Sequence, residues 1–268
     1  MTQLVQLTKE EGGVGVVCLT RPEVRNAVDG PTAAALVRAF AELDADPEVR
    51  VVVLTGAGGH FCAGADLRAQ GTPRGNRVEP GAGGPLGPTH ERPKKPTVAA
   101  VEGYAVAGGL ELALWCDLRV AAEDALFGVF CRRFGVPLID GGTWRLPRLI
   151  GLSRALDLIL TGRAVPAPEA LTMGLVNRVV APGTALEQAL ELARQLAVLP
   201  QACLLADRER AYAGFALSEA EALREELASG AHVLATEESR RAIARFAAGA
   251  GRHGQQVPLD REPDQTPD

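Results

Sequence analysis

An alternation of short β-branched runs with segments of helical spacing most constrains the fold of this 268-residue chain. Residues 14–19 (VGVVCL) and 49–54 (VRVVVL) have the composition of buried strands. Between them, Pro31 opens a segment in which apolar residues recur at three- and four-residue steps, as in an amphipathic helix. Strands and helices that alternate in this way favour an α/β fold, with helices covering the faces of a sheet.

The alternation continues through the middle of the chain and then gives way to helices. Residues 97–101 and 118–122 predict two further strands on either side of an apolar helix over 108–115. After residue 184 the apolar spacing is helical throughout, which predicts a C-terminal helical region. The helices predicted there are 185–198, 202–214, 218–229 and 237–248. Residues 251–268 are polar and lack periodicity, so we expect a disordered tail.

Residues 71–96 interrupt the alternation with a segment that is dense in glycine and proline. Such a composition disfavours both regular helices and strands, and it predicts a mobile loop. Two interpretations stay open for this loop. It is either a disordered surface insertion or a lid over a substrate pocket.

The charge balance and the cysteines exclude several classes of protein. A net charge of -5 argues against the broad basic surface that nucleic-acid binding requires. The five cysteines are widely spaced and form no CxxC pair, so the sequence predicts neither a disulfide framework nor a metal site. The N-terminus has no apolar run after a basic start, and no segment of about 18 apolar residues follows, which favours a cytoplasmic protein away from membranes.

Two motifs that would indicate other enzymes are incomplete. The glycine-rich turn in residues 51–67 lacks the G-x-G-x-x-G spacing of a dinucleotide site, because Phe61 stands where the third glycine would be, and it lacks the Lys-Ser/Thr of a P-loop. The G-x-S spacing at Ser153 lacks the closing glycine of a hydrolase nucleophile elbow and follows no strand, so we expect Ser153 to cap a helix.

A set of motifs resembles one known family in order and spacing. They are RPEVRNAV, FCAGADL, EGYAVAGGLELALWCDL, GGTWRLPRLIG, LILTGR and EALTMGLVNRVV, and they extend over roughly residues 5–196. On these motifs the chain resembles the crotonase family, also called the enoyl-CoA hydratase/isomerase family. The resemblance implies a core of repeated ββα units wound into a spiral over residues 1–196, which carries an acyl-CoA site. It implies that residues 197–268 form a helical region that packs against neighbouring subunits of a homotrimer or hexamer.

The glycines of the third motif suggest a way to stabilise a thioester enolate. Gly108 opens an apolar helix, so its N–H has no partner within the helix and the positive end of the helix dipole lies at the same place. In the family pattern a second N–H comes from the turn in FCAGADL, where the matching residue is Ala63. Ala63 and Gly108 would then form an oxyanion hole. The alternative is that these glycines only permit turns and close packing.

Glu111 lies one helical turn after Gly108, on the face of the helix that carries the donor. A glutamate in the first turn can simply complement the helix dipole or cap the helix. However, this helix is apolar nearly all round and should be buried, and a buried carboxylate requires a specific reason. The resemblance supplies one, because hydratases of the family carry a catalytic glutamate at this position.

The second carboxylate of the hydratase pattern is missing. Cys131 stands where hydratases have another glutamate, and a thiol is a weak hydrogen-bond partner that does not hold a water as a carboxylate does. Cys131 could equally be a small core residue. Asp140 occupies a place where some relatives, such as dienoyl-CoA isomerases, carry a functional aspartate. Its alternative role is to cap a helix that starts near Gly141.

The resemblance also implies a binding mode and three candidate functions. Coenzyme A is part of the substrate, so no further cofactor is expected, and it would lie against the backbone near Ala27, Ala65, Asp66 and Leu67. The leading function is reversible hydration of a trans-2-enoyl-CoA, a lyase reaction. The first alternative is an enoyl- or dienoyl-CoA isomerase that uses Glu111 and Asp140. The second is a member of the fold that binds acyl-CoA or RNA without catalysis.

Overall fold

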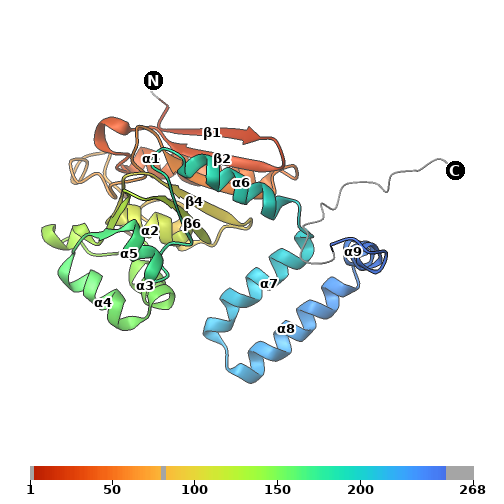
Figure 1. Ribbon diagram of the computed structural model, residues 1–268. Coiled ribbons are helices and arrows are strands. Elements are labelled where there is room, and N and C mark those ends of the chain that lie inside the picture. Colours follow the sequence, from red (N-terminus) through yellow and green to blue (C-terminus); the bar gives the residue numbers. More distant parts are fainter. Residues whose placement is uncertain (1–2, 80–82, 252–268) are drawn as a thin grey trace. The chain divides into compact units, whose positions relative to one another are not determined.

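The computed structural model describes residues 3–79 and 83–251, and the chain divides into two compact units, Met1–Arg194 and Gln195–Asp268 (Figure 1). Residues 252–268 of the predicted tail lie outside the described residues. Within the described residues no single helix is long and apolar enough to cross a membrane, although the bent pair Ala185–Ala197 and Gln201–Ala216 has the combined length and composition.

The described part of the first unit is built on a six-stranded sheet with the strand order β1-β2-β3-β4-β6-β9. Its strands are β1 Val5–Glu10, β2 Val14–Leu19, β3 Val51–Gly56, β4 Thr97–Val101, β6 Leu118–Ala122 and β9 Arg178–Val180. β1 pairs antiparallel with β2, and all the other neighbours are parallel. Every residue of β4 is buried, as expected for a parallel strand covered on both faces. The carboxyl ends of the parallel strands therefore lie at one edge, where connecting loops can form a site.

A second, three-stranded sheet lies in the same unit of the described chain, with the order β5-β7-β8. These strands are β5 Tyr104–Val106, β7 Leu126–Gly128 and β8 Val165–Pro166. Because they are only two or three residues long, they carry no recognisable alternation of apolar and polar residues, and the sequence patterns did not predict them. β5 leads directly to the helix that begins at Gly108, and it therefore fixes where that helix starts.

The helices follow the predicted spacing closely. The helices that begin in the first unit are α1 Gly30–Ala45, α2 Gly108–Trp115, α3 Gly142–Ile150, α4 Leu152–Thr161, α5 Ala167–Thr172 and α6 Ala185–Ala197. Those of the second unit are α7 Gln201–Ala213, α8 Glu219–Leu234 and α9 Glu237–Ala247. Short 3-10 turns lie at Pro22–Val24, Pro88–His90, Phe130–Phe134 and Gly214–Ala216.

The main predictions about secondary structure are confirmed, and one is wrong. The α/β fold class, the strands at 14–19, 97–101 and 118–122, and the four C-terminal helices are all present. Ser153, however, does not cap a helix: α4 begins at Leu152, and its N-cap is Gly151 with a φ of 80°. Glycine is favoured there because it adopts this left-handed backbone without strain.

Asn26 joins the loop before α1 to the loop after β3. Its side chain is fully buried, and its Nδ2 donates to the carbonyls of Ala57 at 2.8 Å and His60 at 2.6 Å. Its Oδ1 accepts the N–H of Arg21 at 2.9 Å. The φ of Asn26 is 57°, a left-handed conformation that asparagine tolerates better than most residues. These bonds hold two distant segments of the chain together directly before the turn that begins at Cys62.

We predict that Asn26→Ala lowers the free energy of unfolding by about 3 kcal/mol, because it leaves one buried N–H and two carbonyls without a partner and places alanine at a positive φ. Gln6, an exposed amide on β1, provides the matched control. Gln6→Ala should change this free energy by less than about 0.5 kcal/mol. Urea denaturation measures both, and equal losses would show that Asn26 has no special role.

Candidate active site

The turn after β3 lies against the first residue of α2. Within this turn Cys62 forms a parallel bridge with Ala105 of β5, and Ala65 forms one with Val28. Between them Gly64 has a φ of 95°, and a Cβ placed on it would lie 2.8 Å from the backbone nitrogen of Gly108. Only glycine combines this conformation with such a close approach. The turn and the start of α2 therefore contact each other through their backbones.

The start of α2 is a buried helix N-terminus. All eight residues of α2 are buried, and Gly108 is its first residue, so the N–H of Gly108 has no acceptor within the helix. The preceding Ala107 has φ 54° and ψ -125°, a strained conformation for a residue with a side chain. It is held by its own N–H, which donates to the carbonyl of Gly128 on β7 at 2.8 Å. The structure thus maintains strain directly before the predicted donor.

The second predicted donor, Ala63, needs correction. The N–H of Ala63 donates to the carbonyl of Arg25 at 3.0 Å, so it is already used within the protein. At Ala65, two residues later, the hydrogen bonds differ. The N–H of Val28 donates to the carbonyl of Gly64 at 2.8 Å, and the carbonyl of Val28 accepts the N–H of Asp66 at 2.9 Å. In a parallel bridge the partner strand binds the residues on either side of the central residue. The N–H of the central residue, Ala65, therefore points away from Val28. Ala65 therefore replaces Ala63 as the candidate donor beside Gly108.

Glu111 has a specific structural partner. Its side chain is 2% exposed, and its Oε1 accepts the backbone N–H groups of Asp140 at 2.9 Å and Gly142 at 2.8 Å. Gly142 is the first residue of α3, so Glu111 binds at the N-terminus of α3 and not at that of its own helix. The second oxygen, Oε2, makes no hydrogen bond within the described residues, and the residue lines a cavity.

The surroundings of Glu111 adjust its acidity. Burial raises the pKa of Glu111 from 4.5 to about 7, and the nearby Asp140 acts in the same direction, while the N–H of Gly142 opposes both. Because Oε1 is occupied by two donors, a proton on this carboxyl group resides on Oε2. A pKa near neutrality suits a group that both accepts and donates a proton during one reaction.

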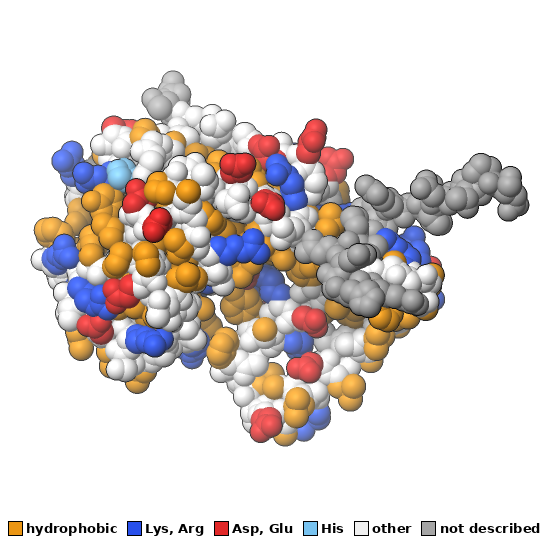
Figure 2. All heavy atoms as spheres, viewed as in Figure 1, with side chains coloured by type: hydrophobic (Ala, Val, Ile, Leu, Met, Phe, Trp, Pro, Cys, Tyr) orange, Lys and Arg blue, Asp and Glu red, His pale blue; other side chains and the backbone are white. Residues whose placement is uncertain are grey.

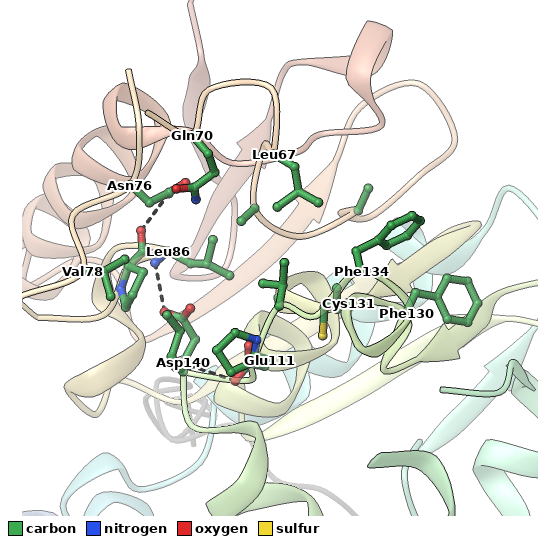
Figure 3. A pocket seen from close by; sticks show the side chains of 18 residues that line it. Leu67, Gln70, Asn76, Val78, Leu86, Glu111, Phe130, Cys131, Phe134 and Asp140 are labelled. Atoms are coloured by element: carbon green, nitrogen blue, oxygen red, sulfur yellow. Dashed lines mark hydrogen bonds between the residues drawn. The ribbon is translucent and has the colours of Figure 1, made fainter. Parts of the chain in front are cut away.

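Asp140 does not cap α3, contrary to the alternative prediction. The N-cap of α3 is Gly141, whose φ is 94°, and no side chain caps the helix at that residue. Instead Oδ1 of Asp140 accepts the N–H of Leu86 at 2.9 Å (Figure 3). It also accepts the hydroxyl of Thr89. Asp140 is 3% exposed, and burial raises its pKa above the ordinary range for aspartate. The carboxylate therefore anchors the glycine- and proline-rich segment to the site.

Described residues of the segment 71–96, among them Asn76 and Leu86, form one wall of the cavity. Leu86 and Thr89 are buried, so the interpretation of a disordered surface insertion is wrong for the residues around them. Arg145 of α3 strengthens the attachment by donating to the carbonyls of Asp140 at 2.7 Å and Thr89 at 2.6 Å. Thr89 and Arg145 were missed in the sequence, because their partners lie about fifty residues away and no local pattern signals them. The lid function of this segment stays a prediction.

Most of the predicted site residues line one cavity. Its volume is about 150 Å³, and its lining is largely apolar. The predicted residues that line it are Ala63, Ala65, Leu67, Gly108, Glu111 and Asp140, and Cys131 lines it as well (Figure 3). Ala27 and Asp66 do not line it: both bind Arg21, which donates to the carbonyl of Ala27 at 2.5 Å and to the Asp66 carboxylate at 2.9 Å.

The described residues contain no group of three or more histidine, cysteine, aspartate or glutamate side chains that could hold a metal ion. Gly108 and Ala65, the two candidate donors, line a small apolar cavity together with Glu111, whose pKa is near neutrality. Such a site can bind a carbonyl oxygen, stabilise the negative charge that develops on it, and transfer a proton nearby.

Comparisons with known proteins agree with this chemistry. A family model described as enoyl-CoA hydratase/isomerase matches residues 9–250. The chain is 42% identical over 192 residues to enoyl-CoA hydratase EchA19 of Mycobacterium tuberculosis, covering 70% of this chain and 72% of the relative. It is 40% identical over 198 residues to a carnitinyl-CoA dehydratase of Salmonella typhi, covering 73% and 75%. The crystal structure of an enoyl-CoA hydratase from Mycobacterium tuberculosis superimposes with a TM-score of 0.87 at 36% identity, covering 91% of this chain and 96% of that one.

The raised pKa of Glu111 predicts a pH dependence of stability. Between pH 4.5 and about 7 the folded protein holds a proton that an unfolded glutamate has released, so stability falls as the pH rises through this window. Relative to Glu111→Gln, which cannot titrate, the wild type should lose about 3 kcal/mol of unfolding free energy between pH 4.5 and 8. Denaturation of both proteins over this range measures the difference. Parallel pH profiles would show that Glu111 titrates normally.

Proposed function

The chain belongs to the enoyl-CoA hydratase/isomerase family, and on this premise we propose that it is an enoyl-CoA hydratase. It adds water reversibly to the double bond of a trans-2-enoyl-CoA thioester. One observation carries the proposal: Oε1 of Glu111 is fixed by two N–H groups, whereas Oε2 makes no hydrogen bond within the described residues and the residue lines the cavity that Gly108 and Ala65 also line. A proton-transfer group is thus held beside the place where a thioester oxygen would bind.

The reaction follows from this arrangement. The thioester oxygen accepts the N–H groups of Gly108 and Ala65, which draws electron density away from the β carbon. Glu111 removes a proton from a water molecule as that water attacks the β carbon, and the negative charge moves to the thioester oxygen as an enolate. Glu111 then returns a proton to the α carbon, so it is ready for the next cycle. Its pKa of about 7 allows both transfers at neutral pH.

The substrate is an acyl-CoA, and coenzyme A enters as part of it, so the proposal requires no separate cofactor. The apolar walls formed by residues such as Leu86, Phe130 and Val136 suit a hydrocarbon acyl group. The backbone near Ala27, Ala65, Asp66 and Leu67 would receive the coenzyme A part. An ion pair between Arg21 and Asp66, at 2.9 Å, stabilises this loop.

Isomerisation of an enoyl- or dienoyl-CoA is the second candidate, and one observation favours it. Asp140 is a second buried carboxylate with a raised pKa in the same cavity, whereas Cys131 supplies only a thiol. Moving a double bond requires proton removal at one carbon and delivery at another, which a pair of carboxylates can perform. Binding of acyl-CoA or RNA without catalysis is disfavoured, because Glu111 is retained in a catalytic arrangement.

We also propose that the protein assembles into homotrimers or hexamers. It would act in the cytoplasm and bind neither membranes nor nucleic acids. Support comes from the C-terminal helices, on which large apolar side chains are exposed (Figure 2). On α8 and α9 these include Leu223, Leu227, Ile243 and Phe246, of which Leu227 is 76% exposed. Apolar surface of this kind commonly marks a protein–protein interface.

The oxyanion hole is tested by two substitutions at Gly108. A Cβ at this position would lie 2.4 Å from Cδ1 of Leu86, so both Gly108→Ala and Gly108→Pro displace that side chain. Proline also removes the N–H, although it is tolerated at the first position of a helix. We expect kcat for crotonyl-CoA hydration to be about a hundredfold lower in the proline variant than in the alanine variant. Similar rates in the two folded variants would exclude this N–H as a donor.

The two carboxylates are distinguished by amide substitutions. Glu111→Gln keeps an oxygen for the N–H groups of α3 but cannot transfer a proton, so kcat should fall by about a thousandfold whichever reaction is native. Asp140→Asn keeps the acceptor for Leu86 and Thr89. It should cost at most about tenfold in a hydratase and about a hundredfold or more in an isomerase. Equal losses in both variants would favour isomerisation, and unchanged rates in both would place the active site elsewhere.

A further inference from the structure

Cys131 has no role in the chemistry described so far. It lies in the 3-10 turn Phe130–Phe134, is 7% exposed, and carries a free thiol. Figure 3 shows its sulfur on the wall of the cavity that Glu111 also lines. Glu111 is near enough to act electrostatically on the thiol. A nucleophilic atom and a proton acceptor thus line the same proposed substrate cavity.

The other cysteines differ from Cys131 in position. All five cysteines lie in the described residues, and Cys131 is the one that lines this cavity. Cys62 is buried and engaged, because its Sγ donates to the carbonyl of Asn26 at 3.1 Å and accepts the N–H of Gly64 at 3.3 Å. Burial raises the pKa of Cys62 and of Cys116 to about 12. Cys203 is exposed in the second unit and provides a natural control.

The proposed substrate makes a thiol at this position chemically significant. In a 2-enoyl thioester the β carbon becomes electrophilic when the carbonyl oxygen accepts hydrogen bonds, which is the basis of water addition in the proposed function. A sulfur nucleophile is intrinsically stronger than water. The cavity of about 150 Å³ is small, so an enoyl group within it contacts the side chains that line it.

We propose that Cys131 adds through its Sγ to the β carbon of a bound 2-enoyl-CoA and forms a reversible thioether adduct in the active site. This inference rests on the proposed function, since it requires the same bound substrate and the same oxyanion hole. The enzyme therefore has a second activity toward its substrate, which competes with hydration.

The step is balanced without any further reactant. Oε2 of Glu111 takes the proton from the thiol as the bond between sulfur and the β carbon forms. The π electrons move to the thioester oxygen, where the N–H groups of Gly108 and Ala65 stabilise the enolate. Glu111 then delivers the proton to the α carbon, so one S–H is added across the double bond. The reverse elimination regenerates both the thiol and the enoyl-CoA.

The state of the free thiol agrees with a base-assisted step. Burial raises the pKa of Cys131 above its ordinary value, and Glu111 contributes in the same direction, whereas Arg132 opposes both. The resting side chain is therefore a thiol and not a thiolate, and it reacts when a neighbouring base removes its proton. This protects Cys131 from general electrophiles and directs it to one that occupies the cavity.

Intact-protein mass spectrometry after an acid quench tests the proposal. Wild-type protein incubated with excess crotonyl-CoA should gain the mass of one complete crotonyl-CoA, and peptide mapping should place it on Cys131. Cys131→Ala should carry at least about tenfold less adduct, while Cys203→Ala should retain the wild-type amount. Butyryl-CoA, which lacks the double bond, should leave no adduct.

Other outcomes overturn the proposal in distinguishable ways. Gain of the crotonyl group alone, without coenzyme A, would show acyl transfer to the thiol instead of addition to the β carbon. An undiminished adduct in Cys131→Ala would assign the reaction to another residue. Wild-type protein that hydrates crotonyl-CoA but forms no adduct would refute this inference and leave the hydratase function intact. Absence of both hydration and adduct would refute both.

Discussion

A buried carboxylate that has two backbone N–H groups as its partners organises this molecule. Glu111 lies on a helix with no exposed residue, and its charge would be costly there without the N–H groups at the start of α3. These hydrogen bonds fix α3 against α2. They stabilise the buried carboxylate and also give the N–H groups at the start of α3 an acceptor. The other oxygen, Oε2, makes no hydrogen bond within the described residues, and Glu111 lines the cavity. Stability and function therefore share a single side chain.

The remaining parts of the site are attached to this pair of helices from distant points in the sequence. Gly64 brings the turn after β3 against Gly108, and Asp140 holds Leu86 and Thr89 beside the start of α3. The anchoring role of Asp140 explains why a second acidic side chain can be retained in a site that needs only one proton-transfer group. Asp140 also connects the wall of the cavity to Glu111, because its own N–H donates to the Glu111 carboxylate.

Sequence patterns predicted several residues that line the cavity but not their hydrogen bonds. Gly108 and Glu111 could be identified because a glycine-led apolar helix with one acid is unusual under elementary rules of burial. The choice of Ala63 over Ala65 failed because the carbonyl of Arg25 binds the N–H of Ala63, whereas Val28 pairs with the groups on either side of Ala65; such pairing across the fold leaves no local pattern. A helix cap was the alternative interpretation of Asp140 because local preference favours it, yet Thr89 and Leu86, far away in sequence, bind it instead. Short strands such as β5 carried no pattern at all.

The contact between Gly64 and Gly108 has a consequence for how the protein can move. Two backbone segments that already meet at van der Waals distance cannot approach further, and the strained residue before Gly108 is held by β7. The distance between Gly64 and Gly108 is therefore tightly constrained. The room needed to admit a bulky thioester must come from another part of the wall, such as the segment around Leu86, which side-chain bonds from Asp140 and Arg145 hold. The part of the cavity that is built on a backbone contact is thus rigid, and the part held by side-chain hydrogen bonds can adapt.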